Sequence, residues 1–212
     1  MTARDDILQS ITSGLTGVRP LDLPAPREPQ PSALDADEQI ERFRSLLEGV
    51  GGTCEQLASA SDVTAAIRAR LEPGSRAVLS DAQELAQLPQ ELPQVDFCTD
   101  PADREQLLAA DWGISCVQWA VAETGTLVLL SDSERHRYVS LVPTRHLAIL
   151  PADRIVPDLS HALARVQTSA ADGLSRTISL ITGPSRTADI ELSLVIGVHG
   201  PRELHVLIVP PA

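Results

Sequence analysis

The polar bend Gly183-Pro184-Ser185-Arg186-Thr187 follows an apolar run and carries groups that suit an anionic ligand. Ser185 and Thr187 supply hydroxyls, and Arg186 supplies a forked cation that pairs with carboxylate or phosphate. If a helix begins here, its free backbone N–H groups would attract the same ligand. The alternative role is structural, with the serine capping that helix and the arginine paired to a following carboxylate.

A second polar bend, Glu123-Thr124-Gly125-Thr126, separates two β-like apolar runs, 116–122 and 126–130. A break this short between two such runs predicts a β-hairpin, with Gly125 supplying the positive φ of the turn. Glu123 at the hairpin tip could act as a catalytic general base or bind a ligand hydroxyl, with Thr124, Gly125 and Thr126 beside it. The alternative is a glutamate that is only solvated.

A third bend, Val198-His199-Gly200-Pro201-Arg202, precedes the last apolar run of the chain. Histidine titrates near neutral pH and can transfer protons, so His199 and Arg202 are candidate ligand-binding residues. A histidine that only hydrogen-bonds the backbone of its turn is the alternative. Two further cationic clusters, 135–137 and 143–146, would suit an anionic ligand or an acidic partner, or are solvated loops.

The spacing of the cysteines and histidines does not support a metal or cofactor site. The three cysteines, Cys54, Cys98 and Cys116, are far apart and form no C-x-x-C pair, whereas an iron–sulfur cluster usually needs four thiolates. The five histidines show no zinc-binding spacing, and no Gly-rich nucleotide motif occurs. We therefore expect no metal, no bound cofactor and three unpaired thiols in a reducing compartment.

The elements that must position these bends alternate between strands and helices. Short apolar runs at 178–181 and 204–209 read as buried strands, and upstream runs alternate with amphipathic helical stretches, the clearest at 35–50. This pattern favours an α/β fold with a mostly parallel sheet flanked by helices and interrupted by the hairpin. We expect the bend at Gly183 to lie at a carboxyl end of the sheet, where ligands bind in such folds. Residues 188–196 are left open between helix and strand, because their apolar residues alternate.

The chain divides into an arm, residues 1–34, and an α/β domain, residues 35–212. The arm begins with a predicted helix over 3–14, whose apolar stripe should pack on the body or on a neighbouring chain. Five prolines between 20 and 31 then predict an extended linker. Helix and linker together suit a homodimer formed by exchange of the arm.

The composition narrows the classes of partner. The formal net charge is −12, which argues against binding a nucleic-acid backbone, and 43% hydrophobic residues are enough for a core. The first residues lack a signal peptide, and no long apolar run predicts a membrane span, so we expect a cytoplasmic protein.

Three phrases of the sequence resemble one family. AETGTLVL (122–129), TGPSRTADIE (182–191) and VIGVHGPRELHV (195–206) are similar to the LUD-domain family, of the lactate-utilisation protein C type. The resemblance runs from about Trp112 to Val209. It implies a fold like that of the CoA-transferase and sugar-phosphate-isomerase group. It also implies a role in oxidising L-lactate to pyruvate beside iron–sulfur partner proteins.

Two functional interpretations follow from different classes. In the first, the chain is a non-redox component of L-lactate oxidation whose bends bind a small carboxylate or phosphate, or a partner chain, while the redox cofactors belong to the partners. In the second, it is a stand-alone enzyme, similar to CoA transferases or isomerases, that uses Glu123. A sensor of lactate-like carboxylates would share the same pocket and need only binding.

Overall fold

The structure is a computed structural model, and it describes most of the chain. The described residues are 2–18, 28–98, 103–131, 136–169, 175–188 and 194–211.

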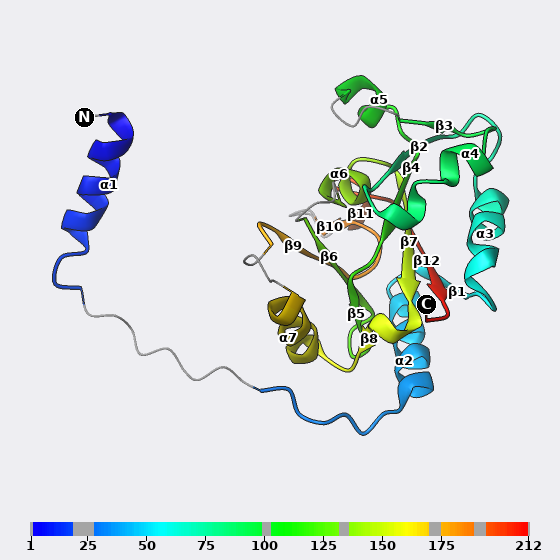
Figure 1. The fold of residues 1–212 in the computed structure, drawn as a ribbon, viewed down its shortest axis with the longest axis horizontal. Coiled ribbons are helices and arrows are strands. Elements are labelled where there is room, and N and C mark those ends of the chain that lie inside the picture. Colours follow the sequence, from blue (N-terminus) through cyan, green and yellow to red (C-terminus); the bar gives the residue numbers. More distant parts are fainter. Residues whose placement is uncertain are drawn as a thin grey trace.

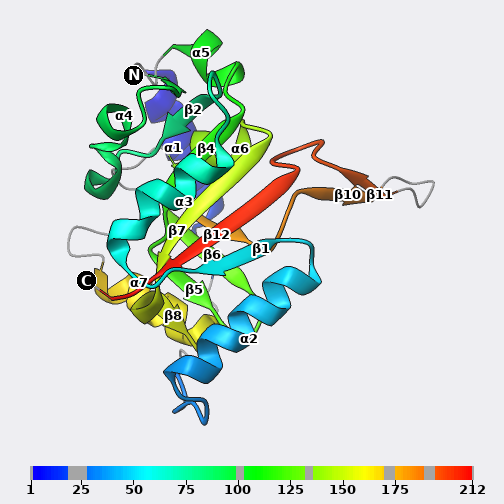
Figure 2. The ribbon, with the colours of Figure 1, turned by 90° about the vertical axis from the view of Figure 1, so that its right-hand side faces the viewer.

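A parallel sheet forms the centre of the molecule, as the alternation of strands and helices predicted. In spatial order its strands are β1 (Thr53–Gln56), β12 (Glu203–Val209), β7 (Arg145–Pro151), β4 (Trp112–Cys116), β2 (Arg76–Leu79) and β3 (Asp96–Phe97). Every neighbouring pair in this order is parallel. The long, continuous apolar strands β7 and β12 lie side by side near its middle (Figure 2), which suits strands buried on both faces.

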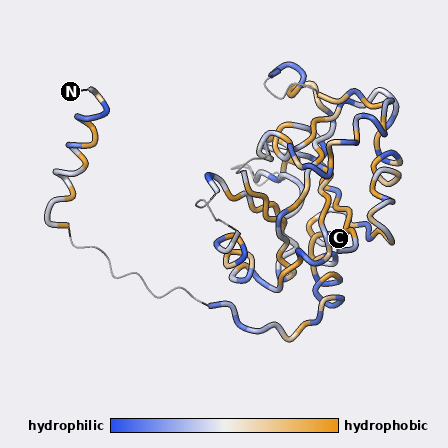
Figure 3. Tube along the Cα trace, in the orientation of Figure 1, coloured by the Kyte–Doolittle hydropathy of each residue, from blue (hydrophilic) through white to orange (hydrophobic). Residues whose placement is uncertain are grey.

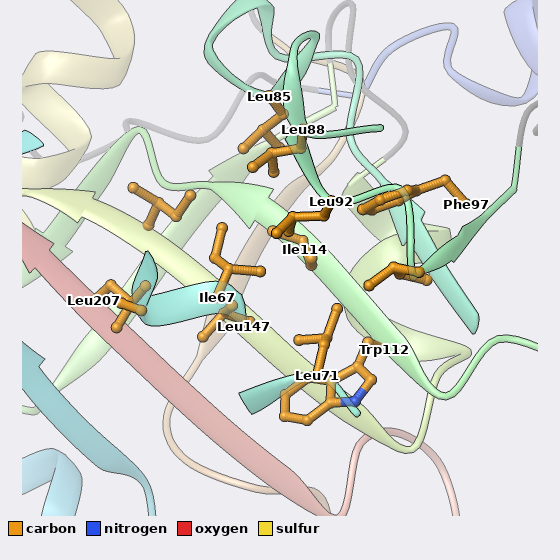
Figure 4. Close-up of a cluster of buried hydrophobic side chains, with 14 of the residues drawn as sticks. Ile67, Leu71, Leu85, Leu88, Leu92, Phe97, Trp112, Ile114, Leu147 and Leu207 are labelled. Carbon is orange, nitrogen blue, oxygen red and sulfur yellow. The ribbon is translucent and has the colours of Figure 1, made fainter. Parts of the chain in front are cut away.

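The alternation of side chains along β12 shows how the two faces are buried. Leu207 and Val209 join one apolar cluster, whereas Val206 and Ile208 join another on the opposite face. The first cluster lies under α3 (Val63–Arg70), the 3₁₀ turn η2 (Gln83–Leu85) and α4 (Leu88–Glu91). Figure 4 shows its side chains between these helices and the sheet.

A second, smaller sheet covers part of the other face. Its strands are β8 (Ile155–Val156), β5 (Trp119–Val121), β6 (Thr126–Leu130) and β9 (Ile178–Ile181), in that spatial order. Together with α2 (Ala36–Gly49) it buries Phe43, Leu47 and Leu127 against the main sheet. The outer face of the second sheet carries α7 (Leu159–Ser169), which buries Ala162 and Val166 there (Figure 1).

The other described elements of the body are short. They are α5 (Arg104–Leu108), α6 (His136–Leu141), the 3₁₀ turns η1 (Ala60–Asp62) and η3 (Ala152–Arg154), and the strands β10 (Arg186–Ala188) and β11 (Leu194–Ile196). Helix α6 packs so closely on β4 that a Cβ atom on Gly113 would lie 1.8 Å from the carbonyl oxygen of Val139. Residues 136 and 137 of the first cationic cluster, for which a solvated loop was one alternative, lie in this helix.

The N-terminal helix forms as predicted but does not pack on the body. Helix α1 (Ala3–Gly14) begins with a capping box in which Thr2 and Asp5 bond each other reciprocally. Ile7, Ile11 and Leu15 form an apolar stripe, yet each is more than half exposed. Figures 1 and 3 show this helix apart from the body, with apolar and polar bands alternating along it. Of the two expected partners of this stripe, the body of the same chain does not cover it, and a neighbouring chain stays a prediction.

Two expectations about connections are also corrected. The run 116–122 is not one strand, because β4 ends at Cys116 in the main sheet and β5 begins at Trp119 in the second sheet. Strands β9 and β12, which we expected to lie in one mostly parallel sheet, belong to different sheets. Where a strand pairs depends on partners distant in sequence, which a local apolar pattern does not encode.

Candidate functional site

The hairpin predicted around Gly125 is present and lies against α2. Strands β5 and β6 pair antiparallel with Val121 opposite Thr126, and Gly125 has a φ of +64°. A Cβ atom at Gly125 would lie 2.5 Å from the backbone nitrogen of Leu47 in α2. Glycine is therefore required here both by its backbone conformation and by the close approach of the helix.

The tip of the hairpin presents its side chains to solvent. The backbone N–H of Glu123 donates to the carbonyl oxygen of Pro157 at 3.0 Å, which fixes the backbone of the tip. The side chains of Glu123 and Thr124 are exposed. Glu123 can therefore meet a ligand or a partner at the surface.

The second bend holds the carboxyl end of the same helix. Gly183, at a φ of +83°, approaches Val50 so closely that a Cβ atom would lie 2.7 Å from Cγ2 of that valine. The guanidinium of Arg186 donates to the backbone carbonyl oxygen of Val50. The last carbonyl groups of a helix lack partners within it and attract cations. Arg186 therefore has a structural partner in α2, whatever else it binds.

No helix begins at the second bend in the described residues. Arg186–Ala188 form β10, which pairs antiparallel with β11 (Leu194–Ile196), while 189–193 lie outside the described residues. Figure 2 shows these strands as a ribbon projecting from the two larger sheets. A helix start therefore does not support an anion site at this bend, and the ligand-binding role of its residues stays a prediction. Residues 188–196 had been left open between helix and strand, and those of them that are described lie in strands.

A chain of hydroxyl groups joins the first bend to the second. The Oγ1 atoms of Thr124 and Thr126 are 2.7 Å apart, and those of Thr126 and Thr182 are also 2.7 Å apart. Thr126 is buried, with 6% of its surface exposed. Threonine at these positions therefore fastens the hairpin to the end of β9.

Backbone hydrogen bonds join the second bend to the third. The N–H of Ser185 donates to the carbonyl oxygen of Pro201 at 2.8 Å, and the N–H of Gly197 donates to that of Ser185 at 2.9 Å. The side chain of Arg202 packs over Gly197, where a Cβ atom would lie 2.1 Å from Cγ of the arginine. The side chains of His199 and Arg202 are exposed.

The three bends therefore meet, and we call residues 123–126, 182–187 and 197–202 the three-bend surface. It lies at the junction of the two sheets and α2, not along one rim of a single sheet. The N–H of Arg202 donates to the carbonyl oxygen of Thr144 at 2.7 Å, just before β7 begins. The surface thus lies at the amino ends of β7 and β12, although we expected a carboxyl end of the sheet.

The space beneath this surface is small. A cavity of about 20 Å³ lies among Gly183, Pro184, Pro201 and neighbouring residues. His146, from the predicted cationic cluster 143–146, lines it but is buried, and its Nε2 lies 2.9 Å from Oγ of Ser115. A cavity of this size holds about one water molecule, so it is too small for an organic anion, which would have to bind at the open surface. In the other cluster, residue 135 and the side chains of 136 and 137 lie outside the described residues.

The three thiols are too dispersed to share one metal cluster. Cys54 on β1 and Cys116 on β4 are separated by two strands, or roughly 14 Å, and face opposite sides of the sheet. Cys98 follows β3, two strands beyond β4, and burial raises the pKa of Cys54 to about 12. Among the described residues, no three His, Cys, Asp or Glu side chains gather as a metal site would require.

Within the same part of the chain, the helices are all too short or too polar to span a membrane.

The chain is similar to a known protein family and to individual known proteins. The family model described as the LUD domain matches residues 40–209. The chain is 46% identical over 99 residues to Lactate utilization protein C of Halalkalibacterium halodurans, covering 46% of this chain and 43% of that protein. That alignment thus spans less than half the length of the relative. The chain is also 30% identical over 224 residues to Lactate utilization protein C of Exiguobacterium sp., covering 99% and 96% of the two chains.

A solved structure supports the fold. A crystal structure of a DUF162 family protein from Deinococcus radiodurans superposes with a TM-score of 0.62 at 23% identity, covering 83% of this chain and 99% of that one. The α/β architecture with its mostly parallel sheet is therefore shared with an experimentally determined protein.

Proposed function

Because the chain belongs to the LUD domain family, whose model matches residues 40–209, we propose that it serves lactate utilisation as a non-redox component of L-lactate oxidation. Its partners would be iron–sulfur proteins that carry the electrons. The three-bend surface would bind one of these partners or a small carboxylate.

One observation carries the proposal. The relationship to Lactate utilization protein C of Exiguobacterium sp. extends over 99% of this chain and 96% of that protein. A match of this extent includes residues of both the arm and the α/β domain, so it does not rest on one isolated motif. The function in the relative's name is therefore the best supported for this chain.

The placement of the thiols supports the non-redox part of the proposal. A cluster held by this chain alone would need thiolates gathered around one point, whereas Cys54 and Cys116 lie on opposite faces of the sheet. The electron-carrying centres are accordingly assigned to partner chains.

The charges of the three-bend surface support a role in binding. Arg186, Arg202 and His199 are exposed there beside one exposed carboxylate, Glu123. A surface with more cations than carboxylates is unusual in a chain with a net charge of −12. It would attract an acidic partner surface or a small carboxylate. The cavity beneath it holds only about 20 Å³, so its open shape suits a partner chain better than an enclosed ligand.

Growth on L-lactate tests the proposal. In a strain that lacks this gene, the wild-type chain should restore growth, and Arg202→Glu should restore it much less, because the variant reverses a charge at the binding surface. Arg104→Glu is the matched control, since Arg104 is also exposed but lies on α5, away from the three bends. Circular dichroism should show both variants folded.

Experiments on purified protein test the non-redox assignment and the ligand of the binding surface separately. The isolated chain with a dye as electron acceptor should not oxidise L-lactate, and turnover by the chain alone would contradict the non-redox assignment. Equal growth of Arg202→Glu and Arg104→Glu would contradict the assignment of the binding surface. Calorimetry with L-lactate distinguishes a small carboxylate from a partner chain as the ligand. If L-lactate releases heat with the wild-type chain and not with Arg202→Glu, the surface binds the small carboxylate.

A further inference from the structure

A large cavity opens at the opposite end of the main sheet from the three-bend surface. It has a volume of about 530 Å³ and lies where three parallel strands end, at Cys116 of β4, Pro151 of β7 and Val209 of β12. Its other walls come from the segment 60–64, which enters α3, and from the segment 84–91, which contains α4.

The size and place of this cavity are those of a ligand site. Pockets for small organic molecules usually measure roughly 300–1,000 Å³, and in open α/β sheets they lie at the carboxyl ends of strands. Strand β12 has seven residues, so the cavity and the three-bend surface are separated by roughly 20 Å along that strand. The cavity is therefore distinct from the surface used in the proposed function.

The floor of the cavity is apolar. Leu85, Val117 and Ile149 line it and are at most 7% exposed. Gln118 also lines it, but its side-chain oxygen accepts the N–H of Leu130 at 2.9 Å, which gives that oxygen a partner within the protein. A ligand would thus bury an apolar body here, and removing that body from water favours binding.

The rim of the cavity is acidic. Glu84, Glu91 and Asp153 line it and are exposed, and Arg154 is the cation among the lining residues. The guanidinium of Arg154 lies 5.0 Å from the centre of the Trp119 ring, so the indole face holds it in a cation–π contact. Three carboxylates against one guanidinium leave the rim with a formal charge of −2. A carboxylate such as L-lactate would be repelled here.

We propose that this cavity binds a small organic cation, a protonated amine attached to an apolar body about the size of an aromatic ring. The apolar body would lie on the floor formed by Leu85, Val117 and Ile149, and the amine would face the carboxylates of the rim. This ligand class follows from the cavity's lining alone and does not depend on the function proposed for the three-bend surface.

Three probes of nearly equal shape and different charge test the ligand class. Phenethylamine is cationic, 2-phenylethanol is neutral and 3-phenylpropionate is anionic. Titrations of ¹⁵N-labelled protein, followed by amide NMR shifts at Val117 and Gln118, should give the highest affinity for the amine. The anion should bind at least about tenfold more weakly, because each exposed charge changes the affinity by about two- to fivefold.

Variants locate the binding. Ala60→Trp should abolish binding of the amine, because Ala60 is exposed and lines the cavity, so the new indole would compete with the apolar body of the ligand for the same space. Ala65→Trp is the matched control on an exposed position of α3 that does not line the cavity. Glu84→Gln should lower the affinity for the amine about two- to fivefold and leave the affinity for the neutral alcohol unchanged.

Several results would overturn the proposal. They are equal affinities for the three probes, amide shifts that map outside the cavity, unchanged binding by Ala60→Trp, and failure of all three probes to bind at millimolar concentration. Thermal melts of Ala60→Trp and Ala65→Trp show whether both variants are folded. If Ala60→Trp is not folded, the charge test with Glu84→Gln decides the outcome.

Discussion

Replacing Gly125 by alanine tests how the three-bend surface is assembled. The new Cβ atom would lie 2.5 Å from the backbone nitrogen of Leu47 and 3.0 Å from the carbonyl carbon of Leu46. Both atoms belong to the backbone of α2, so no side-chain rotation can relieve the contact. The variant must separate the hairpin from the helix or shift the helix.

The magnitude has two parts. An alanine at the positive φ of Gly125 costs about 1–2 kcal/mol, and the forced contact adds about 1–3 kcal/mol, as overpacking usually does. The sum predicts a loss of about 2–5 kcal/mol in the free energy of unfolding. Gly74 is the matched control, because its φ is +83° and an added Cβ would meet no atom within 4 Å. Gly74→Ala should show the backbone cost alone, about 1–2 kcal/mol.

Urea unfolding followed by circular dichroism measures both variants. Alanine also lowers the entropy of the unfolded chain, but it does so alike at the two positions, so the difference between the variants isolates the contact with α2. Gly125→Ala should be less stable than Gly74→Ala by at least about 1 kcal/mol. Equal losses would refute the close packing of the hairpin on the helix, and with it the assembly of the three bends.

Three further changes probe the core, the hydroxyl chain and a helix start. Leu207→Ala should lower the free energy of unfolding by about 2–5 kcal/mol and Leu180→Ala by less than about 1 kcal/mol. Leu207 is 0% exposed in an interior strand, whereas Leu180 is 50% exposed on the edge strand β9. Urea titration compares the stabilities of the two variants. Thr126→Val keeps the side-chain shape but removes two hydroxyl hydrogen bonds, and the same titration should show a loss of about 1–2 kcal/mol. The N–H of His161 donates to Asp158 and holds the pKa of that carboxyl below its ordinary value of 3.8. The carboxylate therefore stabilises the fold at neutral pH and loses this effect as the pH falls through its lowered pKa, so the stability difference between wild type and Asp158→Asn should shrink below about pH 4.

Each of these expectations has a contrary outcome. A larger loss in Leu180→Ala than in Leu207→Ala would mean that β9 is more deeply buried than β12. Full stability of Thr126→Val would mean that the hydroxyl chain contributes nothing to holding the hairpin. A difference between wild type and Asp158→Asn that stays constant into the acid range would mean that the charge of Asp158 is not involved.

Much of the local structure followed from residue patterns. The apolar run that became β12, the hairpin at Gly125 and the helix at 36–49 were predicted, because their signals are local: apolar periodicity and a turn glycine. The three phrases at 122–129, 182–191 and 195–206 also indicated the family, which the match over 40–209 confirms. The functional roles of the site residues stay predictions.

The sequence by itself determined the strand at the end of the chain, the hairpin with its turn glycine at Gly125 and the family to which the chain belongs. Only the tertiary structure decided that β9 and β12 lie in different sheets, that the bend at Gly183 leads into a strand, and that a cavity opens at the carboxyl ends of the main sheet. The physical reason is the separation along the chain of the residues that decide each feature. A turn or an apolar period depends on neighbouring residues, whereas strand pairing and cavities depend on which distant surfaces exclude water together.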